Sequence, residues 1–475
     1  MKGFVKLIAV VVTAAAFAVS CSKDKDSGAV SFDKPAVFID APSGMATVGF
    51  TLRNIKTLSV TSQPTGWDEP MLDQTTGMLT VIAPSATALE KGTAGESGTV
   101  VLAGVTPGGT SVSGVLFVGV VKTVDLSAAG VANSYMASVK ETNYLFDVMH
   151  KGDGSPLATD HLGVIWKSAS GLVQYLQMEN GKASFYIGAD TEDSNKILKG
   201  NAVIGAYDAN DELIWSWHVW ATDYDPEGEN ASVELNGYTM MTRNLGALAN
   251  GNATTSEILA SYGLYYQWGR KDPFCGGTTT ETSATAFAQA AENSIVNPAF
   301  ADTHAWKQES GAAVSTLEYA AAHPLSFLSN KSATGVYDWL AKPRADLWNT
   351  AKTCYDPCPV GYKVPDRDTW DDFADDQDRY VDGTSEWDGE KYGMTYIFGD
   401  LRDWYPTSGY RNRDKGNLAG LATTRTGHYW SNYRSGNTIS CFYISKKLST
   451  GKLLQPQSSS KSDAAYGYSV RCCRE

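Results

Sequence analysis

Residues 263–274 read Gly-Leu-Tyr-Tyr-Gln-Trp-Gly-Arg-Lys-Asp-Pro-Phe, and they form the most distinctive stretch of this chain. Three other distinctive stretches accompany it in a fixed order: Met-Thr-Arg-Asn-Leu-Gly at 241–246, Tyr-Asp-Pro-Cys-Pro-Val-Gly-Tyr-Lys-Val-Pro at 355–365 and Gly-Tyr-Ser-Val-Arg-Cys at 467–472. Four ordered motifs are hard to produce by chance. We therefore treat residues 232–475 as one C-terminal domain.

These four motifs resemble the Fibrobacter succinogenes major paralogous domain, found repeatedly on Bacteroidetes surface lipoproteins and fimbrial-tip-like proteins. The resemblance implies a C-type-lectin-like α+β fold for residues 232–475, a fold that formylglycine-generating enzymes share. It also implies that the segments carrying Cys358 and Cys472 lie side by side, so we expect a disulfide between them.

The N-terminus has the pattern of a secretion signal. Lys2 and Lys6 flank the uncharged apolar run from Leu7 to Val19, which is shorter than the roughly 20 residues of a membrane-spanning helix. Residues 1–20 are therefore predicted to be a signal peptide that directs export.

The end of this signal resembles a lipobox. Small residues precede Cys21 in Ala18-Val19-Ser20-Cys21, although the first position is Ala18 where Leu is commoner. The resemblance implies cleavage and lipidation of Cys21, and two or more acyl chains give a stable anchor. Residues 22–26 resemble the export tract of Bacteroidetes surface lipoproteins, and a solvated linker over residues 21–30 is the alternative. The expected location is the outer membrane, at the cell surface and lipid-anchored.

Two β-rich regions precede the C-terminal domain. From 31 to 124, short apolar stretches recur about every ten residues between turns, which predicts an Ig-like β-sandwich. This layout resembles the BACON modules of Bacteroidetes surface proteins. Residues 125–231 are predicted to be a second β-sandwich. The expected fold class is thus mostly β and multidomain, with two Ig-like modules before the lectin-like domain.

The segment 213–221 carries three tryptophans in one predicted strand. Alternation places Trp215 and Trp217 on one face and His218 and Trp220 on the other. An exposed stacking platform is one interpretation, but burial of both faces is favoured. His218 is then expected to be a packing residue rather than a base.

Local signals predict two helices in the C-terminal domain. Asp366 can cap a helix over 367–380, with Trp370 and Phe373 on its apolar face. Its acidic strip is expected to be solvated, with a calcium site as the alternative. Residues 315–318 form a capping box for a short helix that stops near Pro324.

Six cysteines besides Cys21 lie in the C-terminal domain, and an even count in an exported chain favours disulfides. With Cys358 and Cys472 paired, the remaining expected pairs are Cys275 with Cys354 and Cys441 with Cys473. A zinc site is the alternative, but Cys354 and Cys358 have no neighbouring histidine. No metal and no cofactor is expected.

Several activities lack their sequence signature. Residues 429–432 match a calcium-dependent lectin motif only in part, and the adjacent Cys472 and Cys473 would point to opposite faces of a strand, which does not suit a copper pair. No nucleophile elbow, metal-binding histidine motif, phosphate loop or dinucleotide fingerprint appears. We therefore expect no enzyme. The net charge of −13 without a basic cluster argues against nucleic acid as a partner.

These observations predict a surface lipoprotein for adhesion or ligand binding, with a glycan or matrix protein as ligand and a fimbrial tip or accessory subunit as one setting for that role. The alternatives are a surface glycan-processing enzyme and a purely structural pilus or matrix subunit. Ligand contacts are expected in the loops 387–410 and 429–437, where aromatic residues, Arg and Asn suit recognition. The candidates are Trp387, Trp404, Tyr405, Tyr410, Arg411, Arg413, Tyr433 and Arg434. Core packing is the alternative role for Trp404.

Overall fold

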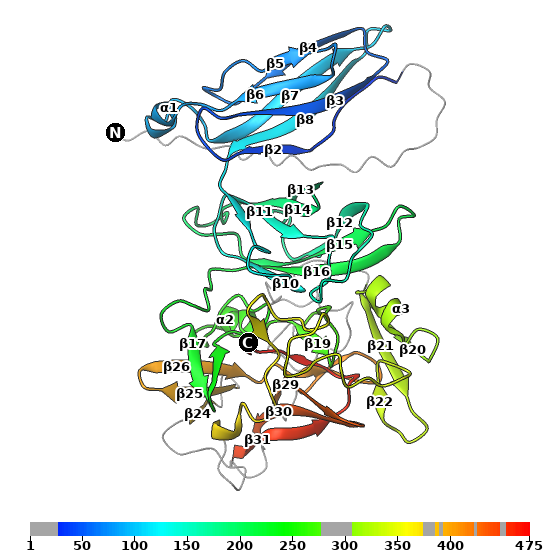
Figure 1. The fold of residues 1–475 in the computed structure, drawn as a ribbon. Coiled ribbons are helices and arrows are strands. Elements are labelled where there is room, and N and C mark those ends of the chain that lie inside the picture. The colour runs from blue at the N-terminus through cyan, green and yellow to red at the C-terminus, as the bar shows by residue number, and fades with distance from the viewer. Residues whose placement is uncertain (1–26, 277–305, 374–384, 389–392, 422–424, 447–452) are drawn as a thin grey trace. The chain divides into compact units, whose positions relative to one another are not determined.

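The computed structural model describes residues 27–276, 306–373, 385–388, 393–421, 425–446 and 453–475. Strands dominate these residues (Figure 1), so the prediction of a mostly β protein is confirmed. The predicted signal peptide and Cys21 lie outside the described residues. In the described part of the chain, no helix is long and apolar enough to cross a membrane.

The chain divides into two compact units. Among the described residues, the first unit holds 27–37 and Met45–Val118, and the second holds Phe38–Gly44 and those after Val118. Residues 125–231 and 232–475, which the sequence treats as two domains, therefore belong to the same compact unit.

The N-terminal part of the described chain contains two four-stranded sheets of order β1-β3-β6-β5 and β2-β8-β7-β4. Alternate residues such as Val48 and Phe50 are buried, as one-sided sheets require. Trp67 is buried as well, and its Nε1 donates to the Gly95 carbonyl at 2.8 Å. The elements are β1 Ala29–Phe32, β2 Ala36–Ile39, β3 Met45–Arg53, β4 Thr57–Ser62, β5 Met71–Asp73, β6 Met78–Ile82, α1 Ala86–Glu90, β7 Ser97–Val105 and β8 Ser111–Val120.

The second unit begins with two more four-stranded sheets, of order β10-β16-β15-β12 and β13-β14-β11-β9. Their strands are β9 Thr123–Asp125, β10 Ser134–Ala137, β11 Thr142–Asp147, β12 His161–Lys167, β13 Gln174–Glu179, β14 Lys182–Ile187, β15 Gly200–Tyr207 and β16 Leu213–Ala221.

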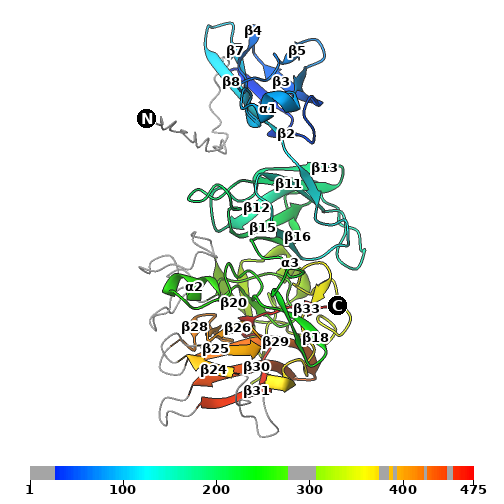
Figure 2. The same ribbon diagram turned by 90° about the vertical axis from the view of Figure 1, so that its left-hand side faces the viewer.

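Strand β16 connects this sandwich to the C-terminal region, and both views place it between the two (Figures 1 and 2). Trp215 and Trp217 pack into the core between the two sheets. On the opposite face, Trp220 joins a core that consists mostly of C-terminal residues, and its Nε1 donates to the Ala247 carbonyl at 3.0 Å. The prediction that both faces are buried is confirmed, because each face has its own core.

The C-terminal region contains a seven-stranded sheet of path β28-β27-β32-β29-β30-β31 with β19 paired to β32, and three smaller sheets. Its strands before residue 380 are β17 Ser232–Leu235, β18 Tyr238–Met241, β19 Tyr265–Gln267, β20 Lys307–Ser310, β21 Ser326–Lys331, β22 Tyr337–Asp338 and β23 Tyr362–Lys363. The later strands are β24 Ser385–Asp388, β25 Gly393–Phe398, β26 Leu401–Pro406, β27 Tyr410–Arg411, β28 Leu418–Ala419, β29 Thr426–Ser435, β30 Thr438–Lys446, β31 Leu453–Ser462, β32 Gly467–Ser469 and β33 Cys473–Arg474. The helices are α2 Thr255–Ala260, α3 Leu317–Ala322 and the 3-10 turn η2 Asp371–Phe373.

The four distinctive motifs meet around the last of them. Backbone hydrogen bonds join Met241 to Cys472 and Leu245 to Val470. Tyr265 pairs with Ser469 in the sheet, and Cys358 forms a disulfide with Cys472 across a Cα separation of 6.0 Å. The last motif, residues 467–472, thus contacts each of the other three motifs and brings the four together.

Both predicted helices require correction. Residues 366–373 form turns and the 3-10 turn η2 instead of an α-helix, although Trp370 and Phe373 are buried in one core as expected. Residues 374–380 lie outside the described residues. The short helix is α3, but its N-cap is Thr316, whose side chain accepts from the amide of Tyr319, and not the first residue of the predicted box. It ends before Pro324 as predicted.

Candidate functional site

Aromatic side chains cross four neighbouring strands of the large sheet in register. His428 on β29 lies opposite Tyr443 on β30. Tyr429 pairs with Ser469 and Arg411 with Gly467, so Tyr468 on β32 lies between His428 and Tyr410. Directly paired residues share a face of a sheet. We call the row Tyr410, Tyr468, His428 and Tyr443 the aromatic ladder.

The rings of the ladder are in contact along its length. Centroids are 5.9 Å apart for Tyr410 and Tyr468, 4.3 Å for Tyr468 and His428, and 4.9 Å for His428 and Tyr443. Tyr468 is buried, whereas the other three side chains are partly exposed. The ladder therefore forms a row of rings of which three reach solvent.

The polar groups of Tyr410 and His428 are neutral. Burial raises the pKa of Tyr410, so its hydroxyl keeps its proton. Burial among the neighbouring rings lowers the pKa of His428 to about 3, so its imidazole is uncharged at physiological pH. Across the described chain, the hydroxyls of Tyr410 and Tyr443 hydrogen-bond no protein group. They are free to bond to a ligand.

One end of the ladder continues into a cationic group. Tyr466 stacks on Tyr468 with centroids 5.2 Å apart, and the Arg413 guanidinium lies 5.2 Å from the Tyr466 ring and 4.8 Å from that of Tyr337. Arg413 also forms an ion pair with Asp463. We call Arg413, Asp463, Tyr337 and Tyr466 the arginine end of the ladder. Here a fixed guanidinium sits between two partly exposed rings.

The predicted ligand residues do not form one surface. Tyr410 and Arg413 belong to the ladder and its arginine end, whereas Tyr433 lies beside Arg367, whose guanidinium is 4.9 Å from its ring. Arg434 forms a buried ion pair with Asp338 at 2.6 Å. Trp387 is only partly buried and packs on the core around Trp370 and Phe373.

Three of the predicted ligand residues are core residues. Trp404 is 2% exposed, and Tyr405 and Arg411 are 0% exposed. The predicted loops are largely strands β24, β25, β26 and β29. Trp404 and Tyr405 are neighbours on β26, where both faces of the strand are covered, and Arg411 is buried on β27. The Arg411 guanidinium donates to the carbonyls of Cys275 and Gly416. The assignment of these three residues to a ligand surface was therefore wrong.

The predicted disulfides were correct in one case of three. Cys358 and Cys472 are joined, as the resemblance implied. The pairs Cys275 with Cys354 and Cys441 with Cys473 do not form, and all four cysteines are free thiols. Burial raises the pKa of Cys275, so it carries a neutral thiol. Cys441 lies on β30 and Cys473 on β33 of different sheets, and Cys275 and Cys354 lie outside the strands.

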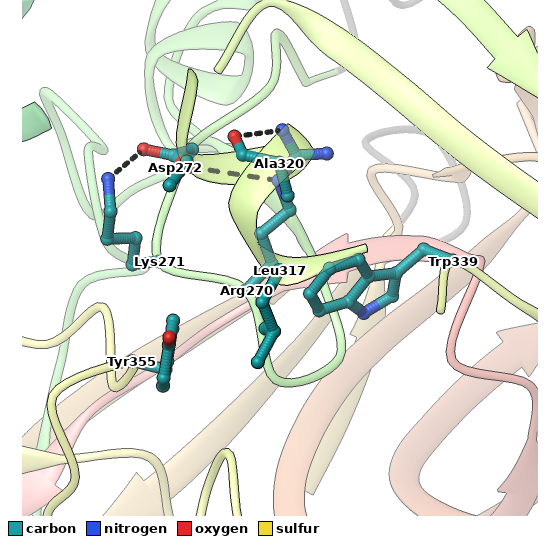
Figure 3. A pocket seen from close by; sticks show the side chains of 8 residues that line it. Arg270, Lys271, Asp272, Leu317, Ala320, Trp339 and Tyr355 are labelled. Atoms are coloured by element: carbon teal, nitrogen blue, oxygen red, sulfur yellow. Dashed lines mark hydrogen bonds and ion pairs between the residues drawn. The ribbon is translucent and has the colours of Figure 1, made fainter. Parts of the chain in front are cut away.

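A small hollow lies where α3 approaches residues 270–272 (Figure 3). Its empty volume is about 210 Å³, including open solvent at its mouth, which is below the usual size of ligand pockets of about 300–1,000 Å³. The charged groups at the hollow already have partners, since Arg270 donates to the Ala320 carbonyl and Lys271 pairs with Asp272. The lining residues are Arg270, Lys271, Asp272, Leu317, Ala320, Ala321, Trp339 and Tyr355.

Beside this hollow, three buried groups form a closed network. Lys271 Nζ donates to Ser216 Oγ at 2.5 Å and to Asp272 Oδ1 at 2.6 Å, and the Ser216 hydroxyl donates to Asp272 Oδ1 at 2.6 Å. Burial lowers the pKa of Lys271. Ser216 is 1% exposed and does not line the hollow, so a substrate cannot reach its hydroxyl. The network instead joins β16 to residues 270–272.

The described residues contain no group of three or more His, Cys, Asp or Glu side chains that could hold a metal ion. Asp368 accepts from the Tyr238 hydroxyl at 3.1 Å, and Asp372 accepts from the Asn236 amide at 2.8 Å. These acids from the predicted strip thus hydrogen-bond a neighbouring turn.

Several residues of the ladder were missed by the sequence analysis. Tyr468 lies in the terminal motif on β32, and Tyr466 directly precedes that strand. In an extended segment, a spacing of two places both rings on one side. That spacing was a usable signal. His428 and Tyr443 gave none, because only the pairing of β29 with β30 places them opposite each other.

No protein-family model matches this chain, and no curated protein matches it in sequence. Among solved structures, SGBP-B of the Bacteroides ovatus mixed-linkage glucan utilization locus, in complex with a mixed-linkage heptasaccharide, aligns with 9% identity and a TM-score of 0.11. The alignment covers 38% of this chain and 42% of that chain.

Two adhesion-related structures align comparably. The D00-D0 domain of intimin shows 12% identity and a TM-score of 0.15 over 40% of this chain and 96% of that chain. The Yersinia pseudotuberculosis adhesin InvE shows 12% identity and a TM-score of 0.13 over 49% and 79%. TM-scores this low do not establish a common fold.

Proposed function

We propose that this chain is a lipid-anchored cell-surface protein that binds a glycan through the aromatic ladder. The observation that carries the proposal is the ladder itself, a row of in-register rings with three partly exposed members and a fixed arginine at one end. Exposed aromatic residues in a contiguous group are characteristic of binding surfaces.

The chemistry of the ladder suits a sugar. Tyrosine offers the face of its ring to C–H groups and a hydroxyl to sugar hydroxyls, and it loses little conformational entropy on binding. His428 is neutral, and the charge of Arg413 is balanced by Asp463. A neutral glycan is therefore favoured over a charged partner. A matrix protein is the other ligand class that such a surface could take, and the test below separates the two.

We further propose roles for the rest of the chain. Lipidated Cys21 holds the protein at the outer face of the outer membrane, and the β-sandwiches carry a C-type-lectin-like head. A fimbrial tip or accessory subunit is the setting that the four motifs suggest for such a protein.

A polymerising structural subunit would need an accessible strand edge. Strand β31 lies at one end of the seven-stranded sheet. It contains Pro456, which cannot donate a backbone hydrogen bond, and Lys461, an exposed charge. Both are devices by which edge strands resist pairing with other chains. This supports ligand binding over assembly through this edge.

The test is an array of glycans and matrix proteins probed with the mature protein and with Tyr410→Ala and Tyr443→Ala. We expect binding to glycans that both substitutions weaken, and no loss for Tyr207→Ala. Tyr207 is a matched control because its ring also stacks on a histidine ring, that of His161, with centroids 5.2 Å apart. This pair lies on a sheet other than that of the aromatic ladder. Binding to matrix proteins alone, or equal binding by all four proteins, would refute the proposal.

A further inference from the structure

We infer that the aromatic ladder binds the interior of an extended neutral glycan chain, laid across the strands, and not a single terminal sugar. The inference rests on the proposed function and adds the length and direction of the ligand. Its basis is the register of the ladder and the difference between its two ends.

The register sets the length of the contact. The ladder uses the neighbouring strands β27, β32, β29 and β30. Neighbouring strands lie about 4.8 Å apart, so four of them span about 14 Å. A pyranose unit in an extended chain advances by about the spacing between strands. About three sugar units would therefore span the ladder from Tyr410 to Tyr443 and contact its partly exposed rings, whereas Tyr468 is buried beneath them.

The shape of the site argues against recognition of one sugar. A single sugar gains affinity when a concave pocket surrounds it and supplies converging polar groups. In the described residues the hollow near Lys271 and Asp272 lies apart from the ladder and shares no residue with it. In a row of partly exposed rings each ring offers a small contact, and useful affinity requires several such contacts along one glycan chain.

The two ends of the ladder differ in chemistry. At the β27 side, Arg413 is fixed by Asp463, and its backbone carbonyl accepts from Ser329 Oγ at 2.6 Å. At the β30 side the ladder ends in Tyr443, whose hydroxyl is free of protein hydrogen bonds in the described chain. The arginine end offers donors held in place, so it should fix the register of the bound chain, and Tyr443 should contact the unit at the other end.

The experiment is isothermal titration of the mature protein with sugars of one to six units from β-1,4-glucan, mixed-linkage glucan, xylan and mannan. For at least one series we expect affinity to rise by about tenfold or more from one unit to about three, and then to level off. Equal affinity for the monosaccharide and the hexamer would overturn the inference and leave the proposed function intact. Binding by none of these sugars would overturn the proposed function with it.

Substitutions of Tyr443 test where the bound glycan lies on the aromatic ladder. Tyr443→Ala should reduce affinity for the trimer and longer sugars while leaving the dimer nearly unchanged, because it removes the last contact only. Tyr443→Phe, which keeps the ring and loses the hydroxyl, guards against a folding defect and should lie between Tyr443→Ala and wild type. Tyr207→Ala should match wild type at every length. An equal loss at all lengths in Tyr443→Ala would contradict the proposed placement.

Discussion

Arg471 donates hydrogen bonds to both carboxylate oxygens of Asp403, each at 2.9 Å, and both side chains are buried. The same guanidinium donates to Asn244 Oδ1 at 2.9 Å and to the Trp404 carbonyl at 2.7 Å, and it lies 3.7 Å from the Tyr405 ring. Arg471 thus links the first and last distinctive motifs to strand β26.

Removing one partner of this buried pair should be costly. Asp403→Asn leaves the Arg471 charge buried without its counter-charge, and we expect a loss of about 3–5 kcal/mol in the free energy of unfolding. Asp346→Asn is a matched control, because the Arg344–Asp346 pair is exposed and should contribute less than about 1 kcal/mol. Urea denaturation measures both, and similar losses in the two variants would refute the assignment.

The Cys358–Cys472 disulfide closes a long loop, since its residues are 114 positions apart. Replacing both cysteines by Ser should lower the free energy of unfolding by about 4–5 kcal/mol in the chain-entropy model. The same structure predicts four reactive thiols in the denatured, unreduced protein, from Cys275, Cys354, Cys441 and Cys473. A titration with a thiol reagent that finds none would instead support three disulfides.

His218 should make stability depend on acid. Its ring lies 2.9 Å from Asn201 Oδ1 and 3.1 Å from Ser134 Oγ, and burial lowers its pKa to about 3. Below pH 6.5 the unfolded chain binds the proton and the folded chain does not, so stability falls by up to about 1.4 kcal/mol per pH unit down to pH 3. When the pH is lowered from 6.5 to 5, the free energy of unfolding of His218→Gln should therefore fall by about 2 kcal/mol less than that of wild type. Identical pH dependence in chemical denaturation would contradict this.

Arg411 and Arg413 are two positions apart and should behave in opposite ways. Arg411→Ala leaves the buried carbonyls of Cys275 and Gly416 without donors, so we expect a loss of about 2 kcal/mol or more. Arg413→Ala should change stability by less than about 1 kcal/mol, because its ion pair with Asp463 is partly exposed. Glycan binding should weaken in Arg413→Ala. A large loss of stability in that variant would show that the arginine end holds the fold together.

Cys21 is the proposed point of membrane attachment. Cys21→Ala should move the protein from the membrane fraction to the soluble fraction, because acyl chains supply the anchoring free energy. Cell fractionation with immunoblotting measures this, and protease treatment of intact cells tests exposure at the surface separately. Retention of the variant in the membrane would refute the lipoprotein assignment.

The sequence predicted the elements better than it predicted the surface. Strand alternation identified β16 and the burial of its tryptophans, since a period of two is visible in one segment. Residue composition wrongly assigned Trp404, Tyr405 and Arg411 to a ligand surface. The first two lie on β26, which pairs with β25, and Arg411 lies on β27, and all three are buried. Aromatic composition alone does not distinguish a ligand-binding loop from a packed hairpin.

The sequence by itself determined the strand-rich class, the Trp-rich strand, the helix that ends before Pro324 and, through resemblance, the Cys358–Cys472 bond. Only the tertiary structure decided which side chains share a surface. Tyr410, Tyr468, His428 and Tyr443 lie on four strands, and the order and register of those strands come from long-range hydrogen bonds. A shift of one residue in any register would turn that strand's ring to the opposite face. The ladder is therefore a property of strand pairing and not of any local stretch of sequence.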